Sequence, residues 1–176
     1  MAQGRYLLHF KRRREGKTNY KKRLQLLLSQ KTRLVIRITN NQVITHLVNY
    51  DAKGDRTVAS VSSTALEKYG WKHSKKNTTA SYLTGLLLAR MAKEHKIKEA
   101  LLDTGLMTVR AGTRLYAVVK GVIDGGINVP VGEGIFPTDD RIKGKHIESY
   151  RKTKIEDDFE NTKKKIMSSK DKRIKK

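Results

Sequence analysis

The segment RLVIRITNNQVITHLV, residues 33–48, carries the pattern that decides the fold. Its apolar residues Leu34, Ile36 and Ile38 stand at every second position, which is the spacing of a strand with one buried face. The dipeptide Asn40-Asn41 then interrupts the alternation, and a second alternating run continues to the end of the segment. We therefore predict a β-hairpin in which two strands are joined by a two-residue turn.

The pattern continues outward from this hairpin with another strand, a helix, a strand and a helix. After a polar loop, residues 56–62 predict a third strand, and residues 77–96 predict a long helix with Asn77 as its N-cap. The apolar run 97–102 predicts a buried strand, and residues 113–123 predict a helix that stops at Gly125-Gly126. The expected fold class is α/β, with three antiparallel strands followed by α-β-α, the order of a ribonuclease-H-like domain.

The composition limits the classes of protein to which the chain can belong. Its 176 residues fit one domain with tails, and the formal net charge of +22 points to a polyanionic partner. There is no cysteine, and the five histidines show no metal-ligand spacing, so we expect no metal site and no cofactor. The chain lacks a long apolar run and a secretory segment, which predicts a cytoplasmic protein with neither a membrane partner nor a small-molecule substrate.

The positive charge is concentrated at the two ends of the chain. Residues 1–23 contain nine Lys or Arg and one acid, and residues 141–176 contain fourteen Lys or Arg and six acids. Basic flanks around a less basic centre are typical of a folded domain with arms that bind a polyanion. We predict a basic arm over 1–30, an α/β domain over 31–140, and a charged, partly helical extension over 141–176 with a weak apolar stripe at Ile155, Phe159, Thr162 and Ile166.

Two motifs that resemble parts of enzyme active sites lack the neighbouring residues that their chemistry requires. Gly16-Lys17-Thr18 matches the end of a phosphate-binding loop, but Lys11 stands where that loop requires its first glycine. Asp103 occupies the place of a fourth-strand acid in a ribonuclease-H-like nuclease, but the first strand has no acid and the long helix has none before Glu94. A two-metal site needs converging carboxylates, so we predict that the chain is not an enzyme.

Basic residues interleaved with aromatic residues favour binding to RNA. The arm places arginines and lysines around Phe10 and Tyr20, which supplies partners for phosphates and rings for unpaired bases. A second basic cluster, residues 68–76, holds the only tryptophan, Trp71, whose alternative role is to cover the core. Arg33 and Arg37 share one strand face, which either lines an RNA surface or is an ordinary solvated face.

Several of these stretches resemble one ribosomal protein family. The runs RRREGKTNYKKR (12–23), ITNNQVI (38–44), KYGWK (68–72) and VVKGVIDGGINVPVGE (118–133) are similar to those of the archaeal and eukaryotic branch of universal large-subunit protein number eighteen, called number five in eukaryotes. The resemblance extends to about Tyr150, and the short tail resembles the archaeal members. It implies binding of 5S ribosomal RNA and attachment of that RNA to the large-subunit RNA in the central protuberance.

The resemblance and the charge pattern together give the expected function. We expect a structural constituent of the large ribosomal subunit, in the cytoplasm, with 5S RNA, large-subunit RNA and neighbouring ribosomal proteins as partners. The alternative is a non-ribosomal basic protein that coats nucleic acid indiscriminately. The arm is expected to lack structure until RNA orders it. The expected RNA-binding residues are Arg12, Arg13, Arg14, Gly16, Lys17, Thr18, Tyr20, Lys22, Arg23, Arg33, Arg37, Asn40, Asn41, Trp71, Lys72, Lys75, Arg141 and Lys143.

Overall fold

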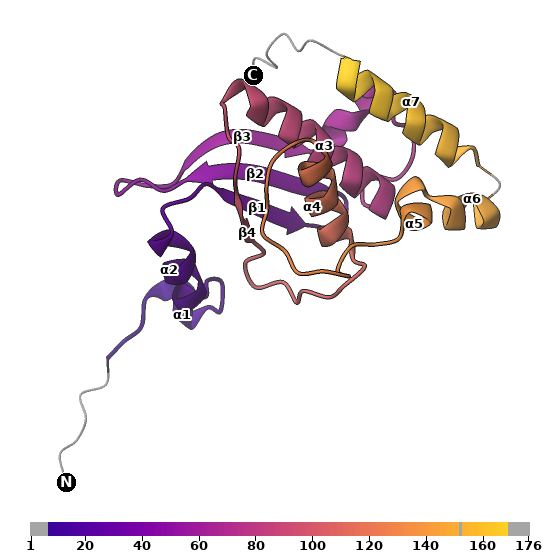
Figure 1. Cartoon of the computed structure of the whole chain (residues 1–176). Helices are drawn as coiled ribbons and strands as arrows, with labels where there is room; N and C mark the ends of the chain where they lie inside the picture. Colours follow the sequence, from indigo (N-terminus) through magenta and orange to yellow (C-terminus); the bar gives the residue numbers. More distant parts are fainter. Residues whose placement is uncertain (1–6, 152, 169–176) are drawn as a thin grey trace.

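A four-stranded sheet with a layer of helices on one of its faces forms the centre of the molecule (Figure 1). The computed structural model describes residues 7–151 and 153–168, so the ends of the expected arm and extension lie outside the described residues. Helices α3 (Thr78–Glu94) and α4 (Arg114–Asp124) form the helical layer. They pack against each other and against the sheet, which gives the molecule its α/β class.

The sheet has the strand order β3-β2-β1-β4. Neighbouring strands among the first three are antiparallel, and β4 lies parallel to β1. This arrangement confirms three antiparallel strands followed by a crossover helix and a parallel strand. The strands are β1 (Arg33–Ile38), β2 (Val43–Asn49), β3 (Arg56–Ser62) and β4 (Leu101–Asp103).

The hairpin of β1 and β2 follows the predicted alternation. Ile38 pairs with Val43, and the Thr39 N–H donates to the Gln42 carbonyl at 2.9 Å, which leaves Asn40-Asn41 at the tip. Residues at alternate positions of β1 to β3 are buried, and these are the ones that face the helical layer. They are Leu34, Ile36, Val43, Thr45, Leu47, Ala59 and Val61.

Strand β4 is shorter than predicted and begins later. The Ile97 N–H donates to the Ala92 carbonyl at 3.3 Å, and Lys96 has a φ of 54°, so this stretch completes the end of α3. The next residues bond to the segment after α4, because the Ala100 N–H donates to the Asn128 carbonyl. Pairing with β1 therefore starts only at Leu101, and the prediction of a strand over 97–102 is wrong at its start.

Helix α3 is the central helix of the core. Asn77 caps it as predicted, because its side-chain oxygen accepts from the Ala80 N–H at 2.7 Å. Thirteen of its 17 residues are buried, so it has contacts on nearly all sides. Helix α4 ends as expected near Gly125, but only Gly126, at φ 99°, has the left-handed conformation, while Gly125 is right-handed.

The C-terminal segment contributes to the same core. It forms α5 (Asp139–Lys143), α6 (Lys145–Arg151) and α7 (Ile155–Ser168), and α7 lies beside α3 (Figure 1). The predicted stripe is confirmed, since Ile155, Phe159, Thr162 and Ile166 are all buried. The Phe159 ring lies 5.7 Å from the Tyr82 ring of α3. A stripe that is weak in the sequence therefore packs fully when a helix face is available to it.

Candidate nucleic-acid interface

The basic arm contains two short helices. Helix α1 (Lys11–Arg14) is a single turn, and Gly16, at φ 62°, reverses the chain direction after it. Asn19 then caps α2 (Tyr20–Leu28) by accepting from the Lys22 N–H at 3.1 Å. The rings of Phe10 and Tyr20 lie 5.8 Å apart and pack the two turns together. Local capping and this ring pair stabilise the two turns, so the structure has helical turns where the sequence analysis expects an arm without structure.

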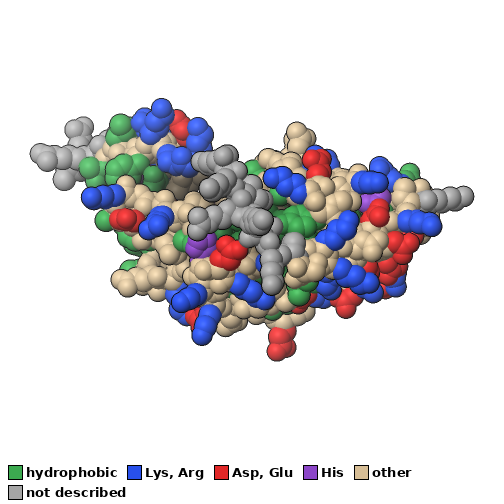
Figure 2. Space-filling model, turned by 90° about the horizontal axis from the view of Figure 1, so that it is seen from above, with side chains coloured by type: hydrophobic (Ala, Val, Ile, Leu, Met, Phe, Trp, Pro, Cys, Tyr) green, Lys and Arg blue, Asp and Glu red, His purple; other side chains and the backbone are tan. Residues whose placement is uncertain are grey.

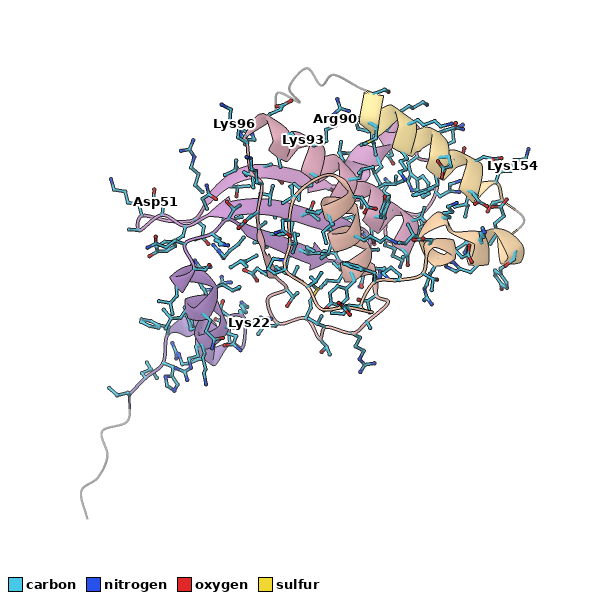
Figure 3. The ribbon with its side chains drawn as sticks, in the orientation of Figure 1. Lys22, Asp51, Arg90, Lys93, Lys96 and Lys154 are labelled. Atoms are coloured by element: carbon cyan, nitrogen blue, oxygen red, sulfur yellow. The ribbon has the colours of Figure 1, made fainter. Side chains whose placement is uncertain are left out.

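Two contacts attach α2 to the α/β layers. Lys22 donates from Nζ to the Thr104 hydroxyl at 2.8 Å, in the loop that follows β4 (Figure 3). Arg23 donates from Nη2 to both carboxylate oxygens of Asp55, at 2.8 and 3.0 Å, in the loop between β2 and β3. Charged hydrogen bonds of this kind are stronger than neutral ones, so the arm has a defined position against the domain.

A cationic cavity lies between the arm and the domain. It has a volume of about 490 Å³ and is bounded by α1, α2, Arg37 of β1 and the loop after β4. Five expected RNA-binding cations line it, together with the carboxylate of Asp103 and the hydroxyl groups of Thr18 and Thr104. These cations are Arg12, Lys17, Lys22, Arg23 and Arg37. The geometry suits a phosphate group, because cations from separate parts of the chain converge on one hollow.

A second hollow, of about 550 Å³, adjoins the first on the arm. It is lined by Arg13, Gly16, Thr18, Tyr20 and, among others, the apolar Leu24 and Leu106. An aromatic ring beside apolar groups and a guanidinium group offers a surface on which an unpaired base can stack. The two hollows together account for most of the expected residues of the arm.

Glycine at position 105 leaves room for Arg37 at the rim of the cationic cavity. Gly105 has a φ of 60°, and a Cβ there would come within 3.0 Å of the Arg37 guanidinium. Arg37 donates to the backbone carbonyl of Asp103 at 3.0 Å, while its side chain stays 42% exposed. It is therefore held in place and still accessible to a ligand.

Two carboxylates, those of Asp55 and Asp103, contact arginines beside the cationic cavity, including the buried Arg33. Burial alone would raise the pKa of Asp55, but the guanidinium groups of Arg33 and Arg23 beside it outweigh burial, so that pKa lies below its ordinary value. Asp103 ends β4, accepts from the Gly105 N–H at 2.9 Å, and contacts the guanidinium groups of Arg33 and Arg37. Asp103 thus forms part of the turn after β4 and faces two arginines.

Two expected RNA-binding residues are buried. The prediction of an RNA-facing Arg33 is wrong, because its side chain is 2% exposed and lies between Asp55 and Asp103. The prediction of a base-stacking Trp71 is also wrong, since Trp71 is 2% exposed and belongs to the core. Its indole N–H donates to the Ser74 carbonyl at 3.2 Å, so its alternative role, covering the core from a loop, is the one observed.

Arg14 is exposed on α1, and the other remaining expected residues lie away from the arm. Asn40 and Asn41 are exposed at the hairpin tip, and Lys72 is exposed in the loop that follows Trp71. Lys75 is paired with Glu67, and Lys143 lies 3.7 Å from Glu156. Arg141 lines a separate cavity of about 820 Å³ with Arg110, Arg114 and His146. The structure therefore does not bring all of the expected residues into one site.

Sequence reasoning missed Asp55, Thr104, Arg110 and Arg114. Asp55 and Thr104 are small polar residues in loops, and their partners are 32 and 82 positions away. Arg110 and Arg114 lie on either side of Thr113 at the start of α4, and this pair of arginines at the start of a helix was the signal that the sequence offered. Lysine and arginine side chains are spread along the length of the face seen in Figure 2, so charge alone does not single out these positions.

The part of the chain that the structure describes contains no group of three or more His, Cys, Asp or Glu placed to hold a metal ion. Within the same residues, no helix combines the length and the apolar character needed to span a membrane.

Comparison with known proteins identifies the family. Residues 4–99 match the family described as ribosomal large subunit proteins 60S L5 and 50S L18. That match covers more than half of the chain. The chain belongs to this family. The matched segment, residues 4–99, includes most of the arm, the first three strands and α3, so most of the residues that line the cationic cavity lie within it.

Archaeal relatives extend the match over most of the chain. Large ribosomal subunit protein uL18 of Korarchaeum cryptofilum is 50% identical over 147 residues, which are 84% of this chain and 75% of that protein. The uL18 proteins of Methanoregula boonei and Methanosphaera stadtmanae are 47% and 46% identical, over 85% and 93% of this chain and 87% and 84% of theirs. The expected resemblance to the archaeal branch of a family of structural ribosomal proteins is confirmed.

Proposed function

We propose that the protein is a structural constituent of the large ribosomal subunit that binds 5S rRNA and helps attach it to large-subunit rRNA in the central protuberance. The observation that carries this proposal is the cavity in which Arg12, Lys17, Lys22, Arg23 and Arg37 converge from the arm and the domain. Its relatives are named large ribosomal subunit proteins, which supports assembly into that particle.

The mechanism is binding without catalysis. The cations of the cavity take the place of condensed counterions around RNA phosphates, and release of those counterions favours the complex. Tyr20, half-buried beside Phe10, is placed to stack on an unpaired base. A concave site of this kind suits a phosphate that projects from a loop or bulge better than the regular backbone of a duplex.

The parts of the chain receive different roles in this proposal. The arm, residues 1–30, binds 5S RNA. The domain, residues 31–140, contacts the same RNA through Arg37, Asn40 and Asn41. The extension, residues 141–176, offers Arg141 and Lys143 to large-subunit rRNA or to a neighbouring ribosomal protein. Arg141 shares a cavity with Arg110 and Arg114, which supports a second contact region on the domain.

The test compares affinities for 5S rRNA and for a DNA duplex of equal length at one salt concentration. Site-specific recognition predicts binding to 5S rRNA that is tighter by about 10³-fold or more, because specific contacts add to the shared electrostatic attraction. An unrelated structured RNA of the same length serves as the second competitor. Equal affinity for all three nucleic acids would instead identify a basic coating protein.

A further inference from the structure

Five side chains of alternating charge form a continuous chain of ion pairs beside the cationic cavity. Arg23 contacts Asp55 at 2.8 Å, and Asp55 contacts Arg33 at 2.7 Å. Arg33 contacts Asp103 at 3.2 Å, and Asp103 contacts Arg37 at 3.4 Å. The chain of ion pairs therefore connects α2 to the β2–β3 loop, then to Arg33 of β1, to the end of β4, and finally to Arg37 of β1.

The middle of this chain of ion pairs is buried and its ends are exposed. Arg33 is 2% exposed, whereas Arg23 and Arg37 are 35% and 42% exposed. A buried guanidinium needs its carboxylate partners, so Asp55 and Asp103 are fixed by Arg33. Each carboxylate also contacts a more accessible arginine at the cavity: Asp55 contacts both Arg33 and Arg23 through Oδ2, whereas Asp103 contacts Arg33 through Oδ2 and Arg37 through Oδ1. The buried arginine thus supports the two exposed ones without reaching a ligand itself.

The arm has a second contact that involves no acid. Lys22 donates to the hydroxyl of Thr104, which is 2% exposed and follows Asp103 directly. Figure 3 shows Lys22 extending from α2 toward this loop. Arg23 and Lys22 are adjacent, so contacts with Asp55 and Thr104 hold α2 at two neighbouring points.

We propose that Asp55 and Thr104 are positioning residues that hold the arm against the domain, so that Lys22, Arg23 and Arg37 face one cavity before RNA arrives. This inference rests on the proposed function. A site formed in advance loses less conformational freedom on binding, which raises affinity without a new contact to the ligand. Asp55 therefore contributes to RNA binding although its own charge repels phosphate.

Asp55 could also have the opposite effect on RNA binding, by competing with RNA for Arg23. A carboxylate bound to Arg23 imitates a phosphate, and RNA would then have to displace it before using that arginine. In that case Asp55 would weaken binding, and its removal would strengthen it. The two roles differ in the sign of one measurement, which makes the inference testable.

The central experiment compares Asp55→Asn with Asp51→Asn. Both substitutions remove one negative charge from the β2–β3 loop, but the Asp51 side chain, labelled in Figure 3, accepts from the Lys53 N–H and has no hydrogen bond or ion pair with residues 7–30, the described part of the arm. Asp51→Asn is expected to leave the affinity for 5S rRNA unchanged or to raise it by up to about twofold, through the added net charge. Asp55→Asn is expected to lower it by about threefold to tenfold, because Arg23 loses a two-oxygen partner.

The salt dependence separates positioning from general stability. If Arg23 no longer meets its phosphate, the plot of log affinity against log salt should flatten by roughly 0.7 to 0.9 for Asp55→Asn, although the protein has become more positive. A residue that only stabilises the fold would leave this slope unchanged in the folded protein. Asp55→Glu keeps the charge and should recover most of the slope.

A second variant, Thr104→Val, changes no charge and nearly preserves the side-chain shape. It removes the acceptor for Lys22 and is expected to lower affinity by about twofold to fivefold, with binding measured well below the melting temperature. This variant and Asp55→Glu carry the test if Asp55→Asn does not fold. Affinities equal to wild type for Thr104→Val, or equal to Asp51→Asn for Asp55→Asn, would overturn the inference. If the wild-type protein showed no preference for 5S rRNA over the other nucleic acids, this result would instead overturn the proposed function.

Discussion

Gly85 of α3 and Gly121 of α4 bring the two helices into direct backbone contact. A Cβ built at Gly85 would overlap the Val118 carbonyl oxygen, and one at Gly121 would overlap the Tyr82 carbonyl oxygen. Each glycine thus provides the space that the other helix occupies. Because α3 is the central helix and α4 covers the sheet beside it, this pair fixes the spacing of the helical layer.

Replacing either glycine by alanine should destabilise the protein. At an exposed helix position Gly→Ala stabilises by about 1 kcal/mol, but here the methyl group meets rigid backbone, so we expect a net loss of about 2 kcal/mol. Urea unfolding of Gly85→Ala and Gly121→Ala gives the value directly. Gly132→Ala is the control, because its Cβ would meet only the flexible Ile135 side chain at 3.1 Å. Variants as stable as wild type would mean that the helices lie farther apart.

Trp71 should matter for stability and not for RNA binding. The substitution Trp71→Leu removes a buried ring and the hydrogen bond to Ser74, and should cost about 2 kcal/mol or more. The affinity for 5S rRNA, measured at a temperature where both proteins are folded, should stay at the wild-type value. Tyr20→Leu is the matched aromatic comparison and should show the reverse, with lower affinity and little change in melting temperature. A fall in affinity for Trp71→Leu equal to that of Tyr20→Leu would assign base stacking to the tryptophan.

The hydrogen bond between the buried Tyr82 and Asp124 at the surface should make stability depend on pH at the alkaline end. Burial, and then the hydrogen bond to Asp124 at 2.7 Å, raises the pKa of the Tyr82 hydroxyl above its ordinary value of 10.0. A group whose pKa is higher in the folded state contributes its stability below the unfolded pKa and loses it as the pH rises further. We therefore expect the contribution of Tyr82 to be full at pH 8 and to decrease above about pH 10.

The measurement is the difference in unfolding free energy between wild type and Tyr82→Phe. It should be about 1 kcal/mol at pH 8 and smaller at pH 11, and the subtraction removes the effect of other groups that titrate in both proteins. Tyr50→Phe, at a tyrosine that is 56% exposed, should show no difference at either pH. A constant difference for Tyr82→Phe across this range would contradict the raised pKa.

The features that the sequence predicts well are those set by neighbouring residues. The alternation in 33–48 and the third strand over 56–62 depend on which face of a strand is apolar, and both are found at the expected positions. Asn77 caps α3 because the cap bonds to an amide three residues away. Local periodicity and capping chemistry are written into consecutive residues, so these predictions need no knowledge of the tertiary structure.

The features that the sequence predicts poorly depend on distant partners. Arg33 occupies the polar face of an alternating strand, yet it is buried because Asp103, 70 positions away, and Asp55 supply carboxylates from other elements. The start of β4 is set by the segment after α4, and Trp71 is covered by packing from the core. The site is affected most, because a charged residue is equally polar whether it faces RNA or an internal acid.

The last prediction concerns the three consecutive arginines of the arm. Arg12, Arg13 and Arg14 are all exposed, and α1 has no buried residue, so the arginines add little to folding stability. If each neutralises one phosphate, replacing all three by alanine should flatten the plot of log affinity for 5S rRNA against log salt by roughly 2 to 3. The melting temperature of the free protein should stay nearly constant.

A control for this triple variant removes the same charge elsewhere. Lys93 and Lys96 are exposed at the C-terminal end of α3, away from the arm (Figure 3), and Lys98 is exposed in the segment that follows. Replacing these three by alanine lowers the net charge equally, but should leave the salt slope near the wild-type value, because the slope counts phosphates in contact and not total charge. Equal slopes for the two triple variants would show that RNA responds only to overall charge. A lower melting temperature for the arginine variant, with an unchanged slope, would instead show that the arm serves the fold and does not bind RNA.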